Sequence, residues 1–391
     1  MTDMSILLKE RVQLYKDAAR HKKTGRVLNL ANIWTWKICD SGYKLSEALF
    51  DYNKMEDIVC KFHEKYQFDF YMDYGLRNPL RIPDVLGFTD YIIDDDTCSL
   101  TYATDINYMT EEDYDLIIEN FDKYLWTRCV PRKFKKLCGP NGKEMLKKAA
   151  EELVKYQEFG AHILNKMETD YGVPGSIFVG VPTFFNFFET LYLAFRGMKA
   201  LSIDLRRIPD KVKAVCQAHG NGRAFEQYKA SVQPGTNMNN GPDFCIYLLS
   251  HVILSKKQFE EFYWPYLKEL FDFVEKYDKI MHIFNESENS RLYDFYKQAP
   301  KGHVVVHFEN DDLFKAKKEI GDTVCLCGGM PSDLLARGTK KECIDYAKRL
   351  IDELASDGGF IFSQDKMISY PNDCSAENLK AVNEFVQEYR I

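Results

Sequence analysis

Residues 303–327 read HVVVHFENDDLFKAKKEIGDTVCLC and form one complete strand–helix–strand unit. The apolar run 303–308 predicts a buried strand, 310–320 predicts an amphipathic helix, and 323–327 predicts a second strand. Two successive strands joined through a helix run parallel to each other. This stretch therefore indicates a parallel α/β architecture.

The same alternation of strand and helix extends in both directions from this unit. KIMHIF (279–284) and GGFIFS (358–363) predict the neighbouring strands, and further apolar runs predict earlier strands at 27–33, 68–74, 176–181 and 243–249. Eight strands spread over the whole chain favour an α/β fold of the closed (β/α)8 TIM-barrel type. An open doubly wound sheet is the alternative, but no Gly-rich phosphate-binding turn follows any of these strands.

We expect a single domain over residues 1–391. Residues 1–25 predict an amphipathic helix that extends the barrel at its N-terminus. FTDYIIDDDTCSLTYA (88–103) predicts a β-hairpin, which we place in an inserted region of hairpin and helix at 85–140. A long helix near 143–169 follows the insertion.

Composition excludes several classes of function. The chain is 45% hydrophobic and 28% charged, which is typical of a globular protein with a large core. Its 52 basic and 59 acidic residues give a net charge of −7, so nucleic acid is not an expected partner. We expect neither a signal peptide nor a membrane span. Eleven cysteines without a CxxC pair predict reduced thiols and a cytoplasmic protein.

The carboxyl ends of the strands are where a TIM barrel carries its chemistry. His282 and His307 close two successive apolar runs, and Glu286 and Glu309 follow them. Imidazole, carboxylate and thiolate all bind Zn²⁺, so these four residues, with Cys327 as a further candidate, predict a zinc site. The alternative is that the histidines are hydrogen-bonded core residues and that Cys327 is a small hydrophobe. His303 begins its strand and is expected at the opposite end.

A substrate pocket is expected at the same edge of the barrel. Aromatic side chains there suit a flat apolar substrate. The residues predicted to bind substrate are Trp34, Trp36, Asp73, Arg77 and Asn240.

Several motifs in this order and spacing resemble the uroporphyrinogen decarboxylase superfamily. They are FEEFYWPYLKEL (259–270), GDTVCLCGGMPSDLLARGTKKECIDYAKRLID (321–352), GGFIFSQDK (358–366) and SAENLKAV (375–382), with RGMKALSIDLRRIPDKV (196–212) and MTEEDYDLII (109–118) upstream. The resemblance covers most of the chain and implies an (α/β)8 barrel.

The superfamily includes porphyrinogen decarboxylases and corrinoid-linked methyltransferases. The segment RVLNLANIWTWKICDSG (26–42) lacks the arginine-rich motif of the decarboxylases. His282-Ile-Phe284 stands where the thiol-specific methyltransferases carry His-x-Cys, and 364–373 lacks their second cysteine. What remains resembles the methyltransferase component of anaerobic aryl O-demethylases. That branch implies Zn²⁺ on Glu286 and His307, with the third ligand open between His282 and Glu309.

The resemblance implies methyl transfer from a methoxylated aromatic (a phenyl methyl ether) to the Co(I) corrinoid of a partner protein. Zn²⁺ would act as a Lewis acid on the ether oxygen, with Glu286 and His307 as the catalytic residues. The alternatives are methyl transfer from a methylcorrinoid to a small acceptor, a metal-free lyase of the decarboxylase type, and a non-catalytic binding protein. The methoxylated ring and the oligomeric state, monomer or homodimer, are left open.

Overall fold

The structure is a computed structural model that describes residues 3–74, 80–88, 91–102, 107–234 and 240–391. Its main sheet has eight parallel strands in the order β2-β1-β10-β9-β8-β7-β6-β5. Their bounds are β1 Asn29–Ala31, β2 Phe70–Tyr71, β5 Thr183–Phe184, β6 Phe244–Leu248, β7 Met281–Asn285, β8 Val304–Phe308, β9 Cys325–Met330 and β10 Phe360–Gln364.

The segment 176–184 joins the two edges of this sheet. Tyr71 of β2 forms a parallel bridge to Ser176, and β5, at the other end of the segment, pairs with β6. A helical turn, α10 (Ile177–Gly180), lies between them, so the predicted strand 176–181 is interrupted. The strands therefore curl into a ring, and the predicted α/β TIM-barrel class is confirmed.

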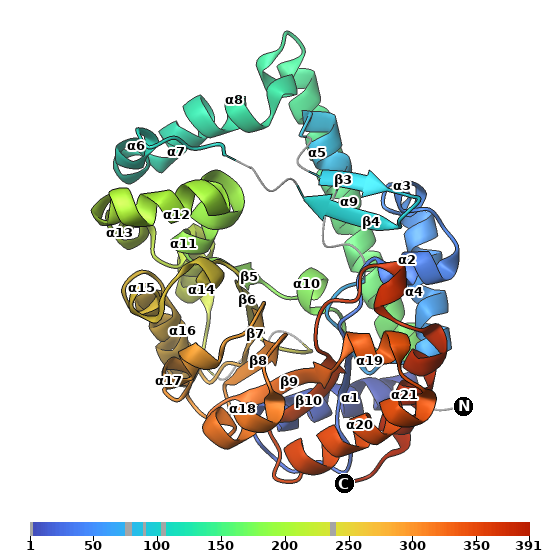
Figure 1. Cartoon of the computed structure of the whole chain (residues 1–391). Coiled ribbons are helices and arrows are strands. Elements are labelled where there is room, and N and C mark those ends of the chain that lie inside the picture. The colour runs from blue at the N-terminus through green and yellow to red at the C-terminus, as the bar shows by residue number, and fades with distance from the viewer. Residues whose placement is uncertain (1–2, 75–79, 89–90, 103–106, 235–239) are drawn as a thin grey trace.

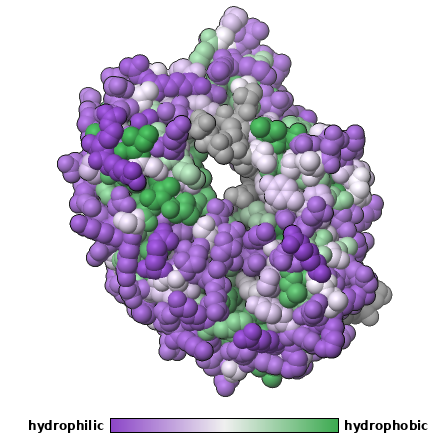
Figure 2. Space-filling model, viewed as in Figure 1, coloured by the Kyte–Doolittle hydropathy of each residue, from purple (hydrophilic) through white to green (hydrophobic). Residues whose placement is uncertain are grey.

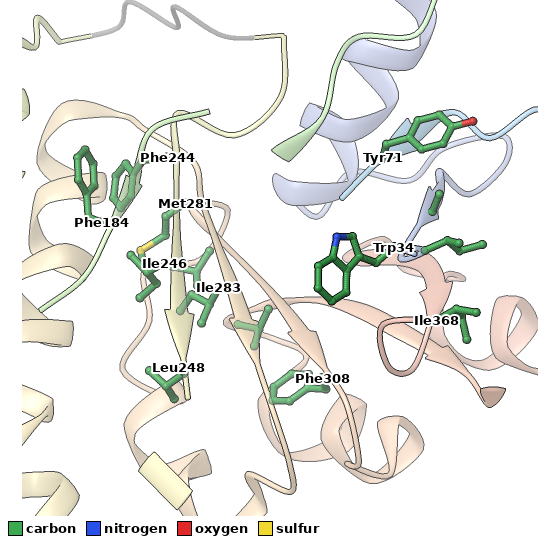
Figure 3. Close-up of a cluster of buried hydrophobic side chains, with 14 of the residues drawn as sticks. Trp34, Tyr71, Phe184, Phe244, Ile246, Leu248, Met281, Ile283, Phe308 and Ile368 are labelled. Atoms are coloured by element: carbon green, nitrogen blue, oxygen red, sulfur yellow. The ribbon is translucent and has the colours of Figure 1, made fainter. Parts of the chain in front are cut away.

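Along each strand, successive side chains point alternately into two hydrophobic layers, one outside the barrel and one inside it. Figure 3 shows part of the outer layer, in which Ile246, Leu248, Met281 and Ile283 lie along β6 and β7. Residues of the opposite parity fill the barrel. This interior cluster comprises Leu14, Tyr15, Ala18, Ala19, Leu28, Leu30, Phe70, Met72, Ile177, Cys245, Tyr247, Leu249, Ile280, Phe284, Val305, Cys325, Cys327 and Ile361.

The N-terminal helix α1 (Met4–Ala19) packs on the interior cluster at the amino ends of the strands. Arg11 of α1 donates from Nε to Asp69 Oδ1 at 3.1 Å, and Arg26 donates from NH1 to Asp69 Oδ2 at 2.6 Å. Asn29 at the start of β1 donates its backbone N–H to the same carboxylate. The predicted N-terminal extension is thus a helix anchored to the barrel through a buried ion pair.

The inserted region leaves the barrel from the carboxyl end of β2. It contains the predicted hairpin as β3 (Tyr91–Asp94) and β4 (Ser99–Tyr102). Its helices are α5 (Arg81–Leu86), α6 (Asp113–Glu119), α7 (Phe121–Tyr124), η1 (Leu125–Cys129), α8 (Val130–Lys133), η2 (Lys135–Cys138) and the long α9 (Gly142–Tyr171). These elements form an arch beside the barrel (Figure 1). Figure 2 shows a hollow between the arch and the barrel, with hydrophobic side chains gathered along one side of it.

The remaining helices surround the strands or cap their ends. They are α2 (Trp36–Ser41), α3 (Leu45–Ala48), α4 (Tyr52–Tyr66), α11 (Phe187–Thr190), η3 (Leu191–Phe195), α12 (Gly197–Arg207), α13 (Pro209–His219), α14 (Gly222–Ser231), η4 (Ser250–Ile253), α15 (Lys256–Phe262), α16 (Trp264–Tyr277), η5 (Ser290–Leu292), α17 (Tyr293–Tyr296), α18 (Leu313–Ile320), α19 (Ser332–Arg337), α20 (Lys340–Leu354), η6 (Pro371–Asp373) and α21 (Ala376–Glu388). Within the described ranges no helix combines the length and the apolarity that a membrane span requires.

One pair of cysteines departs from the expectation of reduced thiols. Cys39 of α2 and Cys98 in the hairpin turn form a disulfide, with their Cα atoms 6.2 Å apart. The other nine cysteines are free. The pair is 59 residues apart in sequence, so only the packing of the insertion against α2 brings the two sulfurs together.

Candidate functional site

His282 and His307 lie inside the barrel, and the prediction that both stand at its mouth is wrong for His282. β7 continues to Asn285, so His282 is the second residue of a five-residue strand. His282 is in register with Cys245 and Val305, which belong to the interior cluster. His307 lies farther toward the carboxyl end, as the fourth residue of the five in β8. Both imidazoles are fully buried.

The hydrogen bonds of His307 fix its tautomer. Nε2 lies 2.9 Å from the backbone oxygen of Gln364 and 3.2 Å from the side-chain amide of Asn32. A carbonyl oxygen only accepts, so Nε2 carries the proton and donates it to Gln364. Burial lowers the pKa of His307 to about 4, so the ring is neutral at pH 7. Nδ1 is therefore an unprotonated acceptor, without a hydrogen-bond partner among the described atoms.

His282 occupies the part of the interior that α1 covers. Its Nδ1 lies 3.1 Å from the hydroxyl of Tyr15, and its Nε2 has no partner among the described atoms. Burial, with a smaller effect of His307, lowers the pKa of His282 to about 3. This histidine is therefore also neutral, and Tyr15 contacts it from the amino end of the barrel.

Two other interior side chains, Asn32 and Ser363, share this lack of partners. Ser363 is in register with Leu30 of the interior cluster, and its Oγ is buried without a hydrogen bond within the described part of the chain. We call Asn32, His282, His307 and Ser363 the interior polar set. Most buried polar atoms in proteins are hydrogen-bonded, so four such residues on β7, β8 and β10 and just after β1 indicate a place where a ligand or water binds. Sequence reasoning missed Asn32 and Ser363, although their strand parity matches that of the histidines.

The two predicted glutamates stand on the carboxyl rim. Glu309 accepts a hydrogen bond from the backbone N–H of Ser287 at 2.5 Å. Glu286 follows β7 and is half-buried. Burial, the nearby Glu189 and then Glu286 raise the pKa of Tyr192 to about 12, which places Glu286 near that phenol.

The predicted zinc site was tested against this geometry. No group of three or more His, Cys, Asp or Glu side chains gathers at metal-binding distance within the described residues. His307 Nδ1 is oriented as a metal ligand would be, because its other ring nitrogen donates to a carbonyl. Cys327 is buried, and burial raises the pKa of its thiol, so it is protonated. The described residues thus offer up to two imidazole nitrogens and do not assemble the predicted set of His282, Glu286, His307, Glu309 and Cys327.

Aromatic rings line the interior beside His307. Phe178 lies 5.0 Å from Tyr247 and 6.1 Å from Phe284, and Phe185 stacks on Tyr247 at 5.4 Å (distances between ring centroids). Phe284 in turn stacks on His307 at 5.1 Å with an interplanar angle of 14°. Phe178 and Phe185 are only partly buried and pack against the interior cluster. We call Phe178, Phe185, Tyr247 and Phe284 the aromatic wall; it leads from the partly exposed segment 178–185 to the buried imidazole.

Two of the residues predicted to bind substrate lie at the carboxyl end. Trp34 follows β1 and donates its backbone N–H to Ile368 at 2.8 Å (Figure 3). Asp73 follows β2, and its carbonyl accepts from Lys37 Nζ at 2.6 Å. Burial lowers the pKa of this lysine to about 8.

The other three residues of that prediction do not join them. Trp36 packs against Phe62 and Tyr66 of α4 in the outer layer. Asn240 precedes β6 and donates to Glu168 Oε1 at 2.8 Å, so it belongs to the amino end and its expected position is wrong. The predicted strand 243–249 already begins after Asn240, so the strand bounds themselves place this residue at the amino end. Arg77 lies outside the described residues.

Glu189 is a buried carboxyl group near the rim that sequence reasoning did not identify. It is fully buried and accepts backbone N–H bonds from Leu249 (2.9 Å) and Ser250 (3.0 Å). Burial raises the pKa of Glu189 to about 7 despite these bonds. Glu189 therefore holds the segment after β6 in place and titrates near neutral pH.

Comparison with known proteins identifies a family and several structural relatives. Residues 192–389 match the family Uroporphyrinogen decarboxylase (URO-D). A methyltransferase from Methanosarcina mazei superposes with a TM-score of 0.60 over 97% of this chain and 98% of its own, at 14% sequence identity. At that identity the likeness concerns the fold. No curated protein sequence matches the chain.

Proposed function

The chain belongs to the uroporphyrinogen decarboxylase family, and from this premise we propose that it is a methyltransferase that removes the methyl group of an aromatic methyl ether and delivers it to the Co(I) corrinoid of a partner protein. The likeness to the Methanosarcina mazei methyltransferase supports the methyltransferase branch of the family. The finer assignment, O-demethylation of a methoxylated ring, rests on the barrel interior.

The aromatic wall is the observation that carries this proposal. Four aromatic rings on the segment 178–185, β6 and β7 form a continuous apolar surface that ends at a neutral, buried imidazole. Such a surface binds a flat ring through burial and offset stacking. A polyanionic porphyrinogen would instead require cationic side chains along this wall, and the four residues of the wall are uncharged.

The chain's own residues would bind and orient the substrate. The aromatic wall would hold the ring, and the interior polar set would fix its rotation by hydrogen bonding. The C–O bond of the methoxy group breaks as the methyl group leaves, and its electron pair stays on the aryl oxygen. The corrinoid would supply the nucleophile for this step. Burial in the barrel excludes water from the ring and strengthens each polar contact with it.

The carboxyl end must remain open to a second protein for this reaction. A hollow lies between the arch and the barrel (Figure 2). The partly exposed Phe178, Phe185 and Tyr192 pack on the interior cluster at this end. An open site of this kind suits a macromolecular methyl acceptor better than a closed pocket would.

Zinc stays a prediction, because the described residues do not bring three ligands together. No step above is assigned to it. Metal analysis of the purified protein, with His282→Ala, Glu286→Ala, His307→Ala and Glu309→Ala variants, tests it directly. About one zinc per chain that is lost on substitution would support the prediction.

The experiment that tests the function is methyl transfer from methoxylated aromatics to a reduced corrinoid protein. The purified chain is mixed with the substrate and Co(I) corrinoid protein, and formation of the phenolic product is followed together with the corrinoid absorbance change. Phe284→Ala, which interrupts the wall beside His307, should lower the rate at least tenfold. Decarboxylation of a porphyrinogen without any corrinoid protein would instead establish the lyase alternative.

A further inference from the structure

We infer that Nδ1 of His307 accepts a hydrogen bond from a hydroxyl group on the substrate ring, so that this site selects neutral phenolic methyl ethers over methoxybenzoates. The inference rests on the proposed function, since it specifies the substrate of the same site. It also gives His307 a role as a hydrogen-bonding residue instead of a metal ligand.

The tautomer of His307 makes its Nδ1 a hydrogen-bond acceptor. Its Nε2 proton is donated to the backbone oxygen of Gln364 at 2.9 Å. Nδ1 is left as an acceptor with no partner among the described atoms. A carboxylate, an ether oxygen or a ketone has no proton to offer it, whereas a phenolic hydroxyl does. The complementary group on the ligand is therefore a donor.

The position of the imidazole carries the second step. The ring of Phe284 stacks on it with centroids 5.1 Å apart, so His307 continues the aromatic wall. A substrate ring against Phe178 and Tyr247 would meet the polar edge of His307 at one end and the open rim at the other. The hydroxyl is then buried, and the methoxy group faces the corrinoid.

The charges at the rim carry the third step. The described residues that follow β2, β7, β8 and β10 supply four carboxyl groups, from Asp73, Glu286, Glu309 and Asp365. Asp365 is half-buried and accepts from the backbone N–H of Ser332 at 3.0 Å. The nearby ammonium of Lys37 is occupied by the carbonyl of Asp73 at 2.6 Å. An anionic substrate would meet like charge here, and a neutral phenol would not.

The test compares three probes that differ in one group: 2-methoxyphenol, methoxybenzene and 3-methoxybenzoate. Their dissociation constants are measured by calorimetry on the full chain, prepared without metal and again with added zinc. We expect 2-methoxyphenol to bind about tenfold more tightly than methoxybenzene, the difference that one buried hydrogen bond makes. His307→Phe should abolish that preference, and the matched control His303→Gln, at the amino end of the barrel, should retain it.

A measurement on the unmodified protein covers the case in which His307→Phe does not fold. The 15N resonance of His307 Nδ1 should shift when 2-methoxyphenol is added and stay in place with methoxybenzene. Tightest binding of 3-methoxybenzoate, lost in Arg77→Gln, would overturn the inference in favour of carboxylate recognition. Zinc bound at one per chain and lost in His307→Phe would overturn it in favour of metal ligation.

The two proposals fail in different ways. Binding of 2-methoxyphenol with the expected preference, but no methyl transfer to any corrinoid protein, would refute the proposed function and leave the hydroxyl contact standing. Methyl transfer from methoxybenzoates with no preference for hydroxylated rings would refute the inference and leave the function standing.

Discussion

The hydroxyl of Tyr15 lies 3.1 Å from Nδ1 of His282 although the two residues are 267 positions apart in the chain. Tyr15 belongs to α1 and is fully buried, so the N-terminal helix places a polar group inside the amino end of the barrel. The contact ties the N-terminal extension to the interior polar set, and it makes α1 part of the barrel core.

Tyr15→Phe should destabilise the protein by about 1–2 kcal/mol, because it leaves a buried imidazole nitrogen without its partner. Urea unfolding followed by circular dichroism measures this change. Tyr370→Phe, at a position that is 42% exposed, is the control and should change stability little. Equal stability of the Tyr15 variant and the wild type would show that the hydroxyl makes no net contribution.

Asp69→Asn should destabilise the protein by about 3–5 kcal/mol, because Arg11 and Arg26 would lose a buried counter-charge. Burial by itself would raise the pKa of Asp69, but Arg26 and Arg11 hold it below its usual value of 3.8. A depressed carboxyl pKa gives stability that is present above pH 3.8 and lost as pH falls through the folded-state value. Acid unfolding should therefore be less steep below pH 3.8 in the variant. Asp333→Asn, in an exposed ion pair, is the control.

His307→Gln should change how stability depends on pH. The pKa of His307 is about 4 in the folded protein, against an ordinary value of 6.5, because burial disfavours the charged ring. The neutral ring favours folding fully above pH 6.5, and this contribution is lost as pH falls toward 4. Relative to the variant, the wild type should lose about 3 kcal/mol over that window. Unfolding midpoints at pH 7, 5.5 and 4 measure the difference, and a constant difference would contradict a neutral buried His307.

Thiol counting should separate the paired cysteines from the free ones. The unfolded protein should react at nine thiols without reductant and at eleven with it, since the Cys39–Cys98 disulfide removes two. The bridge closes a loop of 59 residues, which corresponds to about 4 kcal/mol in the chain-entropy account. Cys39→Ser should lower the unfolding midpoint accordingly, and Cys138→Ser, at an exposed free thiol, should not. Eleven reactive thiols under oxidising conditions would contradict the pairing.

The candidate site was only partly predictable from sequence. Strand parity correctly placed Cys325 and Cys327 on one face, because side-chain direction alternates strictly along a strand. The start of the apolar run correctly placed His303 at the amino end. The ends of the strands were harder to predict, so His282 was expected at the rim, whereas β7 continues for three residues beyond it. Asn240 was assigned to the wrong end, although its own strand was predicted to begin after it, at residue 243.

The sequence by itself determined the architecture. The spacing of neighbouring residues predicts each local element. These elements are eight apolar runs separated by helical patterns, a hairpin and an N-terminal helix. Parallel strands joined by helices leave few possible sheet topologies, and the observed ring is one of them.

Only the tertiary structure decided the chemistry of the interior. The contacts of His307 with Asn32 and Gln364, of His282 with Tyr15, and of Cys39 with Cys98 join residues 57 to 275 positions apart. Tautomer, burial and bonding depend on distances between such residues, and no local pattern encodes those distances. The barrel is thus predictable from the order of its strands, whereas the atoms that face its interior are set by the register and shear of the closed sheet.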